Sequence, residues 1–121
     1  MKGTNQGTNL PLTHAIKFKS EGPAGTVYYS EQDFTLPFYW ERGTVGFDVY
    51  LPTSDEWLAF CEEHNAAGAK GRRDEIVARL ANGIARQEAK RAKVSIDDSG
   101  ITFSYEGDWL HRVMGKILGV D

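Results

Sequence analysis

The residues of this chain best suited to chemistry are a cysteine and a histidine three positions apart, Cys61 and His64, in the segment CEEH. On a helix this spacing brings two side chains to one face, where a histidine can take the proton of a thiol and activate it as a nucleophile. The sequence shows no third group nearby to orient the histidine and no oxyanion donor. We therefore expect Cys61 to be a buried free cysteine beside a helix-terminal histidine, and we predict no catalytic residue.

Metal and cofactor sites have equally little support. CEEH would be half of a metal site, but His14 and His111 are isolated and Cys61 is the only cysteine. Asp97 and Asp98 look like paired carboxylates, yet Asp and Ser are the residues expected in a hairpin turn. The sequence has no P-loop, no G-x-G-x-x-G after a strand and no H-E-x-x-H. We predict no metal, no cofactor and no enzymatic activity.

Length and composition indicate a soluble globular domain. The chain has 121 residues, of which 40% are hydrophobic and 26% charged, which suits one domain. Residues 1–13 (MKGTNQGTNLPLT) lack apolar periodicity, and they also lack the cationic start and apolar run of a secretory signal. We therefore predict a flexible segment over 1–13, a single domain over 14–121 and a cytoplasmic location. No apolar run approaches the roughly 18 residues of a membrane helix.

The elements that must position any site follow from hydrophobic periodicity. Two-residue alternation predicts strands at 14–19, 26–30, 34–41 and 45–51, and a second hairpin over 94–107 with Val94, Ile96, Ile101 and Phe103 facing inward. A capping box, TSDE at 53–56, predicts a short helix from Trp57 to about Asn65 with Leu58 on its apolar side. Further helices are predicted over 72–92 and 109–118. The order ββββααββα predicts an α+β fold, a mostly antiparallel sheet of about six strands with helices on one face.

The stretch FTLPFYWERGTVGFDVYL, residues 34–51, predicts the central hairpin. A two-residue turn at Gly43-Thr44 would pair inward residues with one another, namely Trp40 with Phe47, Phe38 with Val49 and Leu36 with Leu51. A slip by one residue would bury Glu41 and Asp48, so the sequence strongly specifies which face is which.

Alternation also places three tyrosines on the opposite face, Tyr28, Tyr39 and Tyr50, near Glu41 and Asp48. If that face is open, it is an aromatic and acidic patch, and we take these five residues as the candidate partner-binding site. Tyrosine is common in interface hot spots because it offers a large area and one hydroxyl at low entropic cost. In the alternative, a helix or a second protomer covers the face and the tyrosines form a second core layer or a homodimer surface.

A second candidate surface is basic. Residues 69–93 contain eight basic and three acidic residues, although the whole chain has a net charge of −3. On one long helix, four of the basic residues recur every seven positions and form a stripe: Arg72, Arg79, Arg86 and Lys93. Phosphate could bind along such a stripe, which gives the alternative of a nucleic-acid-associated regulator. However, Glu75 lies four residues before Arg79, as in an ordinary intrahelical pair, and no recognition motif accompanies the stripe.

The segments TVYYSEQDFTLPFYWERG, PTSDEW and GRRDEIVARLANGIARQ together resemble bacterial immunity proteins of polymorphic or contact-dependent toxin systems. The similarity is one of layout and covers residues 26–103. It assigns no functional residue. The resemblance implies a class of activity, stoichiometric binding that blocks a cognate toxin, and hence a protein partner. The negative net charge and the lack of a recognition motif argue against nucleic acid, and the lack of a long apolar run argues against a membrane.

Overall fold

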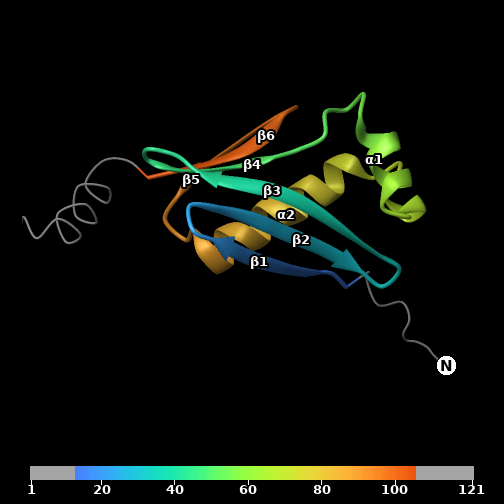
Figure 1. The fold of residues 1–121 in the computed structure, drawn as a ribbon, viewed down its shortest axis with the longest axis horizontal. Coiled ribbons are helices and arrows are strands. Elements are labelled where there is room, and N and C mark those ends of the chain that lie inside the picture. The colour runs from blue at the N-terminus through green and yellow to red at the C-terminus, as the bar shows by residue number, and fades with distance from the viewer. Residues whose placement is uncertain (1–12, 106–121) are drawn as a thin grey trace, which may run out of the picture.

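Six strands pair antiparallel in one open sheet, and two α-helices complete an α+β fold (Figure 1). The computed structural model describes residues 13–105. The strands are β1 (Ala15–Glu21), β2 (Ala24–Glu31), β3 (Phe34–Arg42), β4 (Gly46–Tyr50), β5 (Lys93–Asp97) and β6 (Gly100–Ser104), in the sheet order β1-β2-β3-β4-β6-β5. The helices are α1 (Trp57–Glu63) and α2 (Arg73–Glu88), with a 3-10 turn, η1 (Ala67–Ala69), between them. The predicted fold class is confirmed, whereas the helix predicted at 109–118 and nearly all of the predicted flexible segment lie outside the described residues.

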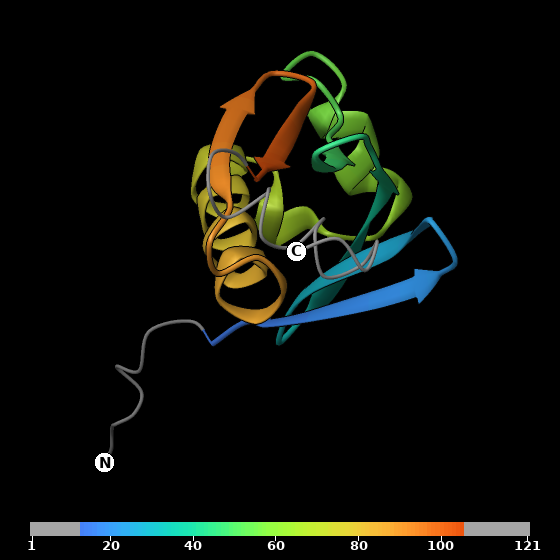
Figure 2. The same ribbon diagram turned by 90° about the vertical axis from the view of Figure 1, so that its left-hand side faces the viewer.

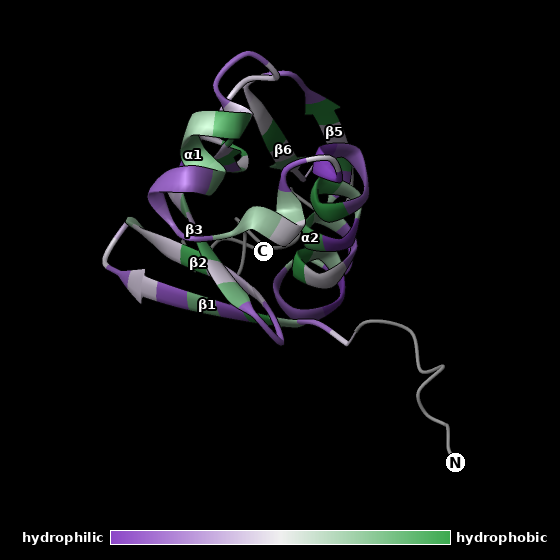
Figure 3. Cartoon of the chain, turned by 90° about the vertical axis from the view of Figure 1, so that its right-hand side faces the viewer, coloured by the Kyte–Doolittle hydropathy of each residue, from purple (hydrophilic) through white to green (hydrophobic). Residues whose placement is uncertain are grey.

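The helices cover one face of the sheet, which we call the inner face. Alternate strand residues point toward them and are buried, among them Val27, Tyr29, Leu36, Phe38, Trp40, Ile101 and Phe103. Figure 3 shows the hydrophobic side of each helix turned toward this shared interior. The sheet is strongly twisted, so that β1 and β2 at one edge run in a different direction from β5 and β6 at the other (Figure 2).

Only one of the two hydrogen bonds of the predicted capping box forms at the start of helix α1. Glu56 reaches back to accept a hydrogen bond from the Thr53 amide at 2.9 Å, whereas the Thr53 side chain caps nothing. Trp57 is buried against Phe38, and its Nε1 donates to the carbonyl oxygen of Ala69 at 2.9 Å. The prediction that Leu58 faces the core is wrong, because Trp57 and Cys61 occupy the buried side and leave Leu58 exposed.

Helix α2 buries the predicted apolar stripe but is shorter than predicted. Its buried residues include Ile76, Val77, Leu80, Ala81 and Ile84. The helix ends at Glu88 because Ala89 has left helical geometry, and the chain then passes into β5. None of the helices within residues 13–105 is both long and apolar enough to cross a lipid bilayer.

The central hairpin has the predicted faces but a register that differs by two residues. Trp40 pairs with Val49, Glu41 with Asp48 and Arg42 with Phe47. The turn is longer than predicted and is closed by a hydrogen bond from the Gly43 amide to the Gly46 carbonyl at 2.7 Å. Gly46 lies against β6, where a Cβ would come within 1.8 Å of the Phe103 carbonyl oxygen. A two-residue shift preserves the faces, so the hydrophobic pattern could not distinguish the two registers.

The second hairpin is only half buried. Ile101 and Phe103 are fully buried, whereas Val94 and Ile96 are 38% and 50% exposed although they were also predicted to face inward. The four residues do share a face, because Val94 pairs with Phe103 and Ile96 with Ile101. The difference arises because β5 is the edge strand, with all five residues exposed.

Candidate functional site: an acidic tyrosine patch on the outer sheet face

The face of the sheet turned away from the helices carries the predicted partner-binding residues. Tyr39 and Tyr50 are 51% and 46% exposed, so neither ring belongs to a second core layer within the described residues. Both are large aromatic side chains that a solvated sheet face does not need for packing. We call the group formed by Tyr39, Glu41, Asp48 and Tyr50 the acidic tyrosine patch.

Tyr39 and Tyr50 stack on each other across β3 and β4. Their ring centroids are 5.7 Å apart, with an interplanar angle of 21°. The observed register explains this contact, because one further step from the Trp40–Val49 pair places Tyr39 opposite Tyr50. An aromatic pair in this position holds both rings in place at little further entropic cost on binding.

Glu41 and Asp48 lie directly opposite each other on the same strands. Like charges in this arrangement destabilise a sheet. Within residues 13–105 neither carboxylate has a salt bridge. Their partners are hydroxyls: Tyr50 donates to Glu41 Oε1 at 3.4 Å, and Thr102 on β6 donates to Asp48 Oδ1 at 2.9 Å.

The negative charge of the patch changes the pKa of Tyr50. The carboxylate of Glu41, together with partial desolvation and the charge of Asp48, raises the pKa of the Tyr50 hydroxyl. Tyr50 therefore stays protonated and remains a hydrogen-bond donor at neutral pH. The patch thus presents two aromatic rings, each with its hydroxyl, and two carboxylates.

Tyr28, on β2, lies diagonally across from Tyr39 and is not part of the Tyr39–Tyr50 stack. It is half-buried and pairs with Pro37 on one side and Lys17 on the other. With Lys17 and Lys19 of β1 it lines a separate open depression of about 480 Å³. The outer face is therefore acidic around Tyr39 and Tyr50 and basic beyond Tyr28, a division that the sequence analysis missed, although the lysines of AIKFKSE alternate with its inward residues.

The predicted basic stripe is not formed on one helix. Lys93 lies on β5, Arg72 precedes the first residue of α2, and Arg86 is exposed near the end of the helix. Arg72 donates to both oxygens of Glu31 at 3.0 and 2.8 Å and also to Glu75. Arg79 pairs with Glu75 at 3.0 Å and with Glu31 at 3.6 Å. Two of the four cations are thus committed to internal carboxylates.

This ion network is part of the fold. The Glu31 side chain is 4% exposed and accepts a third hydrogen bond from the Tyr29 hydroxyl at 2.6 Å. Burial alone would raise the pKa of Glu31, but the hydrogen bonds from Arg72 and Tyr29 and the charges of both arginines outweigh it and hold this pKa below its ordinary value. The network joins the end of β2 to the start of α2.

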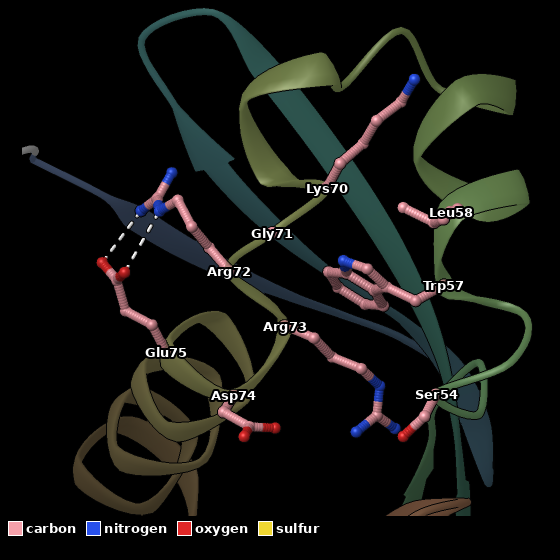
Figure 4. Close-up of a pocket in the computed structure, with 9 residues that line it drawn as sticks. All are labelled: Ser54, Trp57, Leu58, Lys70, Gly71, Arg72, Arg73, Asp74 and Glu75. Carbon is pink, nitrogen blue, oxygen red and sulfur yellow. Dashed lines mark hydrogen bonds and ion pairs between the residues drawn. The ribbon is translucent and has the colours of Figure 1, made fainter.

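An open depression of about 500 Å³ lies where the chain enters α2 (Figure 4). Three cations line it, but each is directed to its own acceptor. Lys70 contacts Glu62 at 3.1 Å, Arg72 is held as described above, and Arg73 donates to the carbonyl oxygens of Pro52 and Asp98 at 2.8 Å. These cations serve to join loops and do not converge on a common anion.

The residues first considered for chemistry have structural roles. Cys61 is buried, and burial raises the pKa of its thiol, which makes it a poor nucleophile. Asp97 Oδ1 accepts hydrogen bonds from the amides of Ser99 and Gly100 and so closes the β5–β6 turn, as predicted. Asp98 binds Ser54 and thereby ties this turn to the start of α1.

No family model matches this chain, and neither curated proteins nor solved structures give a match.

Proposed function

We propose that this protein is a non-enzymatic binding module whose acidic tyrosine patch binds a basic surface of a partner protein. The observation that carries the proposal is the juxtaposition of Glu41 and Asp48 beside two stacked, exposed tyrosines. The carboxylate pair costs stability and has no compensating cation among residues 13–105. A partner lysine or arginine would supply that cation, while the tyrosine rings would provide the apolar contact area.

In its narrower form the proposal is that the partner is a cognate toxin, which the protein neutralises by stoichiometric binding. This form rests on the resemblance of residues 26–103 to immunity proteins. A nuclease toxin binds phosphates with basic residues, and two adjacent carboxylates present the same sign of charge to such a groove. Nothing in the arrangement of Arg72, Arg79, Arg86 and Lys93 favours the alternative of a nucleic-acid-associated regulator.

Co-expression tests the proposal. The reading frame immediately upstream of the gene is expressed from an inducible promoter in a bacterial host, with or without this protein. We expect its product to arrest growth, the wild-type protein to restore growth, and the double variant Tyr39→Ser/Tyr50→Ser to fold but fail to restore it. Leu58→Ser, which removes an exposed apolar side chain from α1, is the matched control and should protect as the wild type does.

Two outcomes would count against the proposal. If the double variant protects as well as the wild type, the patch is not the binding surface. If the neighbouring product is harmless and does not bind the wild-type protein, the toxin partner is wrong. Circular dichroism of the double variant shows whether a loss of protection reflects a lost contact or a lost fold.

A further inference from the structure

The two edge strands of the sheet, β1 and β5, differ in what they offer to a second copy of the chain. An edge strand presents unpaired backbone donors and acceptors, and proteins commonly protect it with lysines or by covering it. On β1, antiparallel self-pairing centred on Phe18 would bring Lys17 opposite Lys19 of the copy, so like charges oppose the contact. Strand β5 is not covered by any of the described residues, because every one of its own five residues is exposed, and its single lysine stands at one end of the strand.

The sequence of β5, Lys93-Val94-Ser95-Ile96-Asp97, is complementary to itself in the antiparallel direction. Pairing two copies about Ser95 places Lys93 of each opposite Asp97 of the other, which gives two opposite-charge pairs on the outer face. The same pairing places Val94 opposite Ile96 on the inner face, twice. These are the side chains that the fold leaves 38% and 50% exposed, and Figure 3 shows the hydrophobic colour reaching the end of β5.

Backbone geometry allows the same register. The β5–β6 hairpin is closed by the two-residue turn Asp98-Ser99, so Asp97 and Gly100 form a hydrogen-bonded pair and the backbone groups of Asp97, Ser95 and Lys93 face β6. The N–H and C=O groups of Val94 and Ile96 therefore point away from the sheet. In the pairing about Ser95, Val94 of one copy and Ile96 of the other exchange backbone hydrogen bonds at both ends of the strand.

We propose that the protein forms a symmetric homodimer in which β5 of one copy pairs antiparallel with β5 of the other and joins two six-stranded sheets into one. The interface is isologous, as two-fold symmetry requires. It is small, so we expect a weak, concentration-dependent dimer. Strands β3 and β4 lie away from this edge, so the acidic tyrosine patches of both copies remain open on the same face of the joined sheet.

Analytical ultracentrifugation of the full chain over a range of concentrations gives the first test. We expect a monomer–dimer equilibrium that Ile96→Lys abolishes, because the substitution puts a charge into the apolar contact at a residue already exposed in the monomer. Lys93→Glu, which places a carboxylate opposite Asp97, should raise the dimer dissociation constant roughly tenfold, and added salt should reduce the difference. Circular dichroism verifies that both variants fold.

Disulfide trapping tests the register. Ser95 meets its own copy in a pair that is not hydrogen-bonded, where Cα atoms lie about 4.5 Å apart, close enough for a disulfide. In a Cys61→Ala background, Ser95→Cys should form covalent dimers much faster than Lys17→Cys on the other edge. Equal rates for the two variants, or a dimer that persists in Ile96→Lys, would overturn the proposal.

Amide hydrogen exchange identifies what occupies the edge. Protection of the Val94 and Ile96 amides that rises with protein concentration supports a second copy. Protection that is the same at all concentrations in a monomeric sample would mean that residues of the same chain cover β5, and complete lack of protection would mean that nothing does. Either result contradicts the dimer without touching the proposed function of the outer face.

Discussion

At the scale of single residues, Glu41 and Asp48 face each other across β3 and β4 with only hydroxyl groups as partners. The opposed carboxylates are expected to destabilise the free protein. Glu41→Gln keeps the size and an acceptor for Tyr50 while it removes one charge. We expect it to raise the free energy of unfolding by about 0.2–1 kcal/mol at low salt and to lower the pKa of Tyr50 toward its ordinary value.

Denaturant unfolding measures the first effect, and an NMR titration that follows the assigned ring signals of Tyr50 measures the second. Glu21→Gln is the control, since Glu21 is also exposed on a strand but pairs with Ala24; its stability should not change. A Glu41→Gln protein less stable than the wild type would show that the pair is not repulsive, and the argument for a missing partner cation would fail.

Glu31, unlike Glu41 and Asp48, is a carboxylate with two arginine partners, Arg72 and Arg79. Since its pKa lies below the ordinary value of 4.5, the unfolded state takes up a proton before the folded state does. Its contribution to stability is therefore complete above about pH 4.5 and is lost as the pH falls through the folded pKa. We expect Glu31→Gln to cost about 2 kcal/mol at pH 7, because Arg72 loses a buried charged acceptor.

Unfolding followed from pH 7 to pH 3 checks this prediction. The wild type should lose more stability over this range than Glu31→Gln does, and the two curves should converge at low pH. Glu75→Gln, at the exposed end of the same network, should have a smaller effect at pH 7. Parallel curves for wild type and Glu31→Gln would mean that Glu31 does not titrate as described.

At the scale of elements, α2 crosses β1 at Gly83. From sequence alone this glycine is a weakness in the helix, since alanine is favoured there by about 1 kcal/mol. In the fold, a Cβ at this position would lie 2.0 Å from Cδ1 of Ile16 and 3.2 Å from its Cγ1. Contact with the sheet therefore outweighs helix propensity, and we expect Gly83→Ala to destabilise the protein by about 1 kcal/mol.

A double-mutant cycle tests the cause. Ile16→Val removes the clashing methyl group, so Gly83→Ala should cost less in that background than in the wild type. Asn82→Ala, one position away on the exposed side of the helix, should be neutral or slightly stabilising. If Gly83→Ala stabilises the wild-type protein, close packing of α2 on β1 is not what excludes a side chain at this position.

Elements also show how far the sequence determines the fold and the patch. Alternation in 34–51 correctly predicted which residues face the helices, and hence that Tyr39 and Tyr50 face away from them. It could not predict that these two rings stack, or that Glu41 opposes Asp48, because both facts depend on a register set by the turn and by the fit of Gly46 against β6. Local periodicity likewise correctly predicted the face on which Val94 and Ile96 lie. It could not predict that they are exposed, because their burial depends on the order of strands in the sheet, where β5 lies at the edge.

At the scale of the whole molecule, the charged side chains of the described residues form two groups, one that is paired within the fold and one that is not. The arginines at the start of α2 and the acidic end of β2 neutralise each other inside the fold, whereas the carboxylates of the outer face remain uncompensated within residues 13–105. Pairing through β5 would place two such patches on one continuous sheet face. The helices thus cover the inner face of the sheet, and the outer face presents the acidic tyrosine patch.

The most direct test of this account is calorimetric titration of the purified protein with the product of the neighbouring reading frame. We expect a 1:1 complex per chain whose affinity falls with salt, and an affinity roughly 100-fold weaker for folded Tyr39→Ser/Tyr50→Ser, because two hot-spot side chains are lost. Leu58→Ser should bind as the wild type does. Equal affinity of the double variant and the wild type would contradict the assignment of the acidic tyrosine patch as the binding surface.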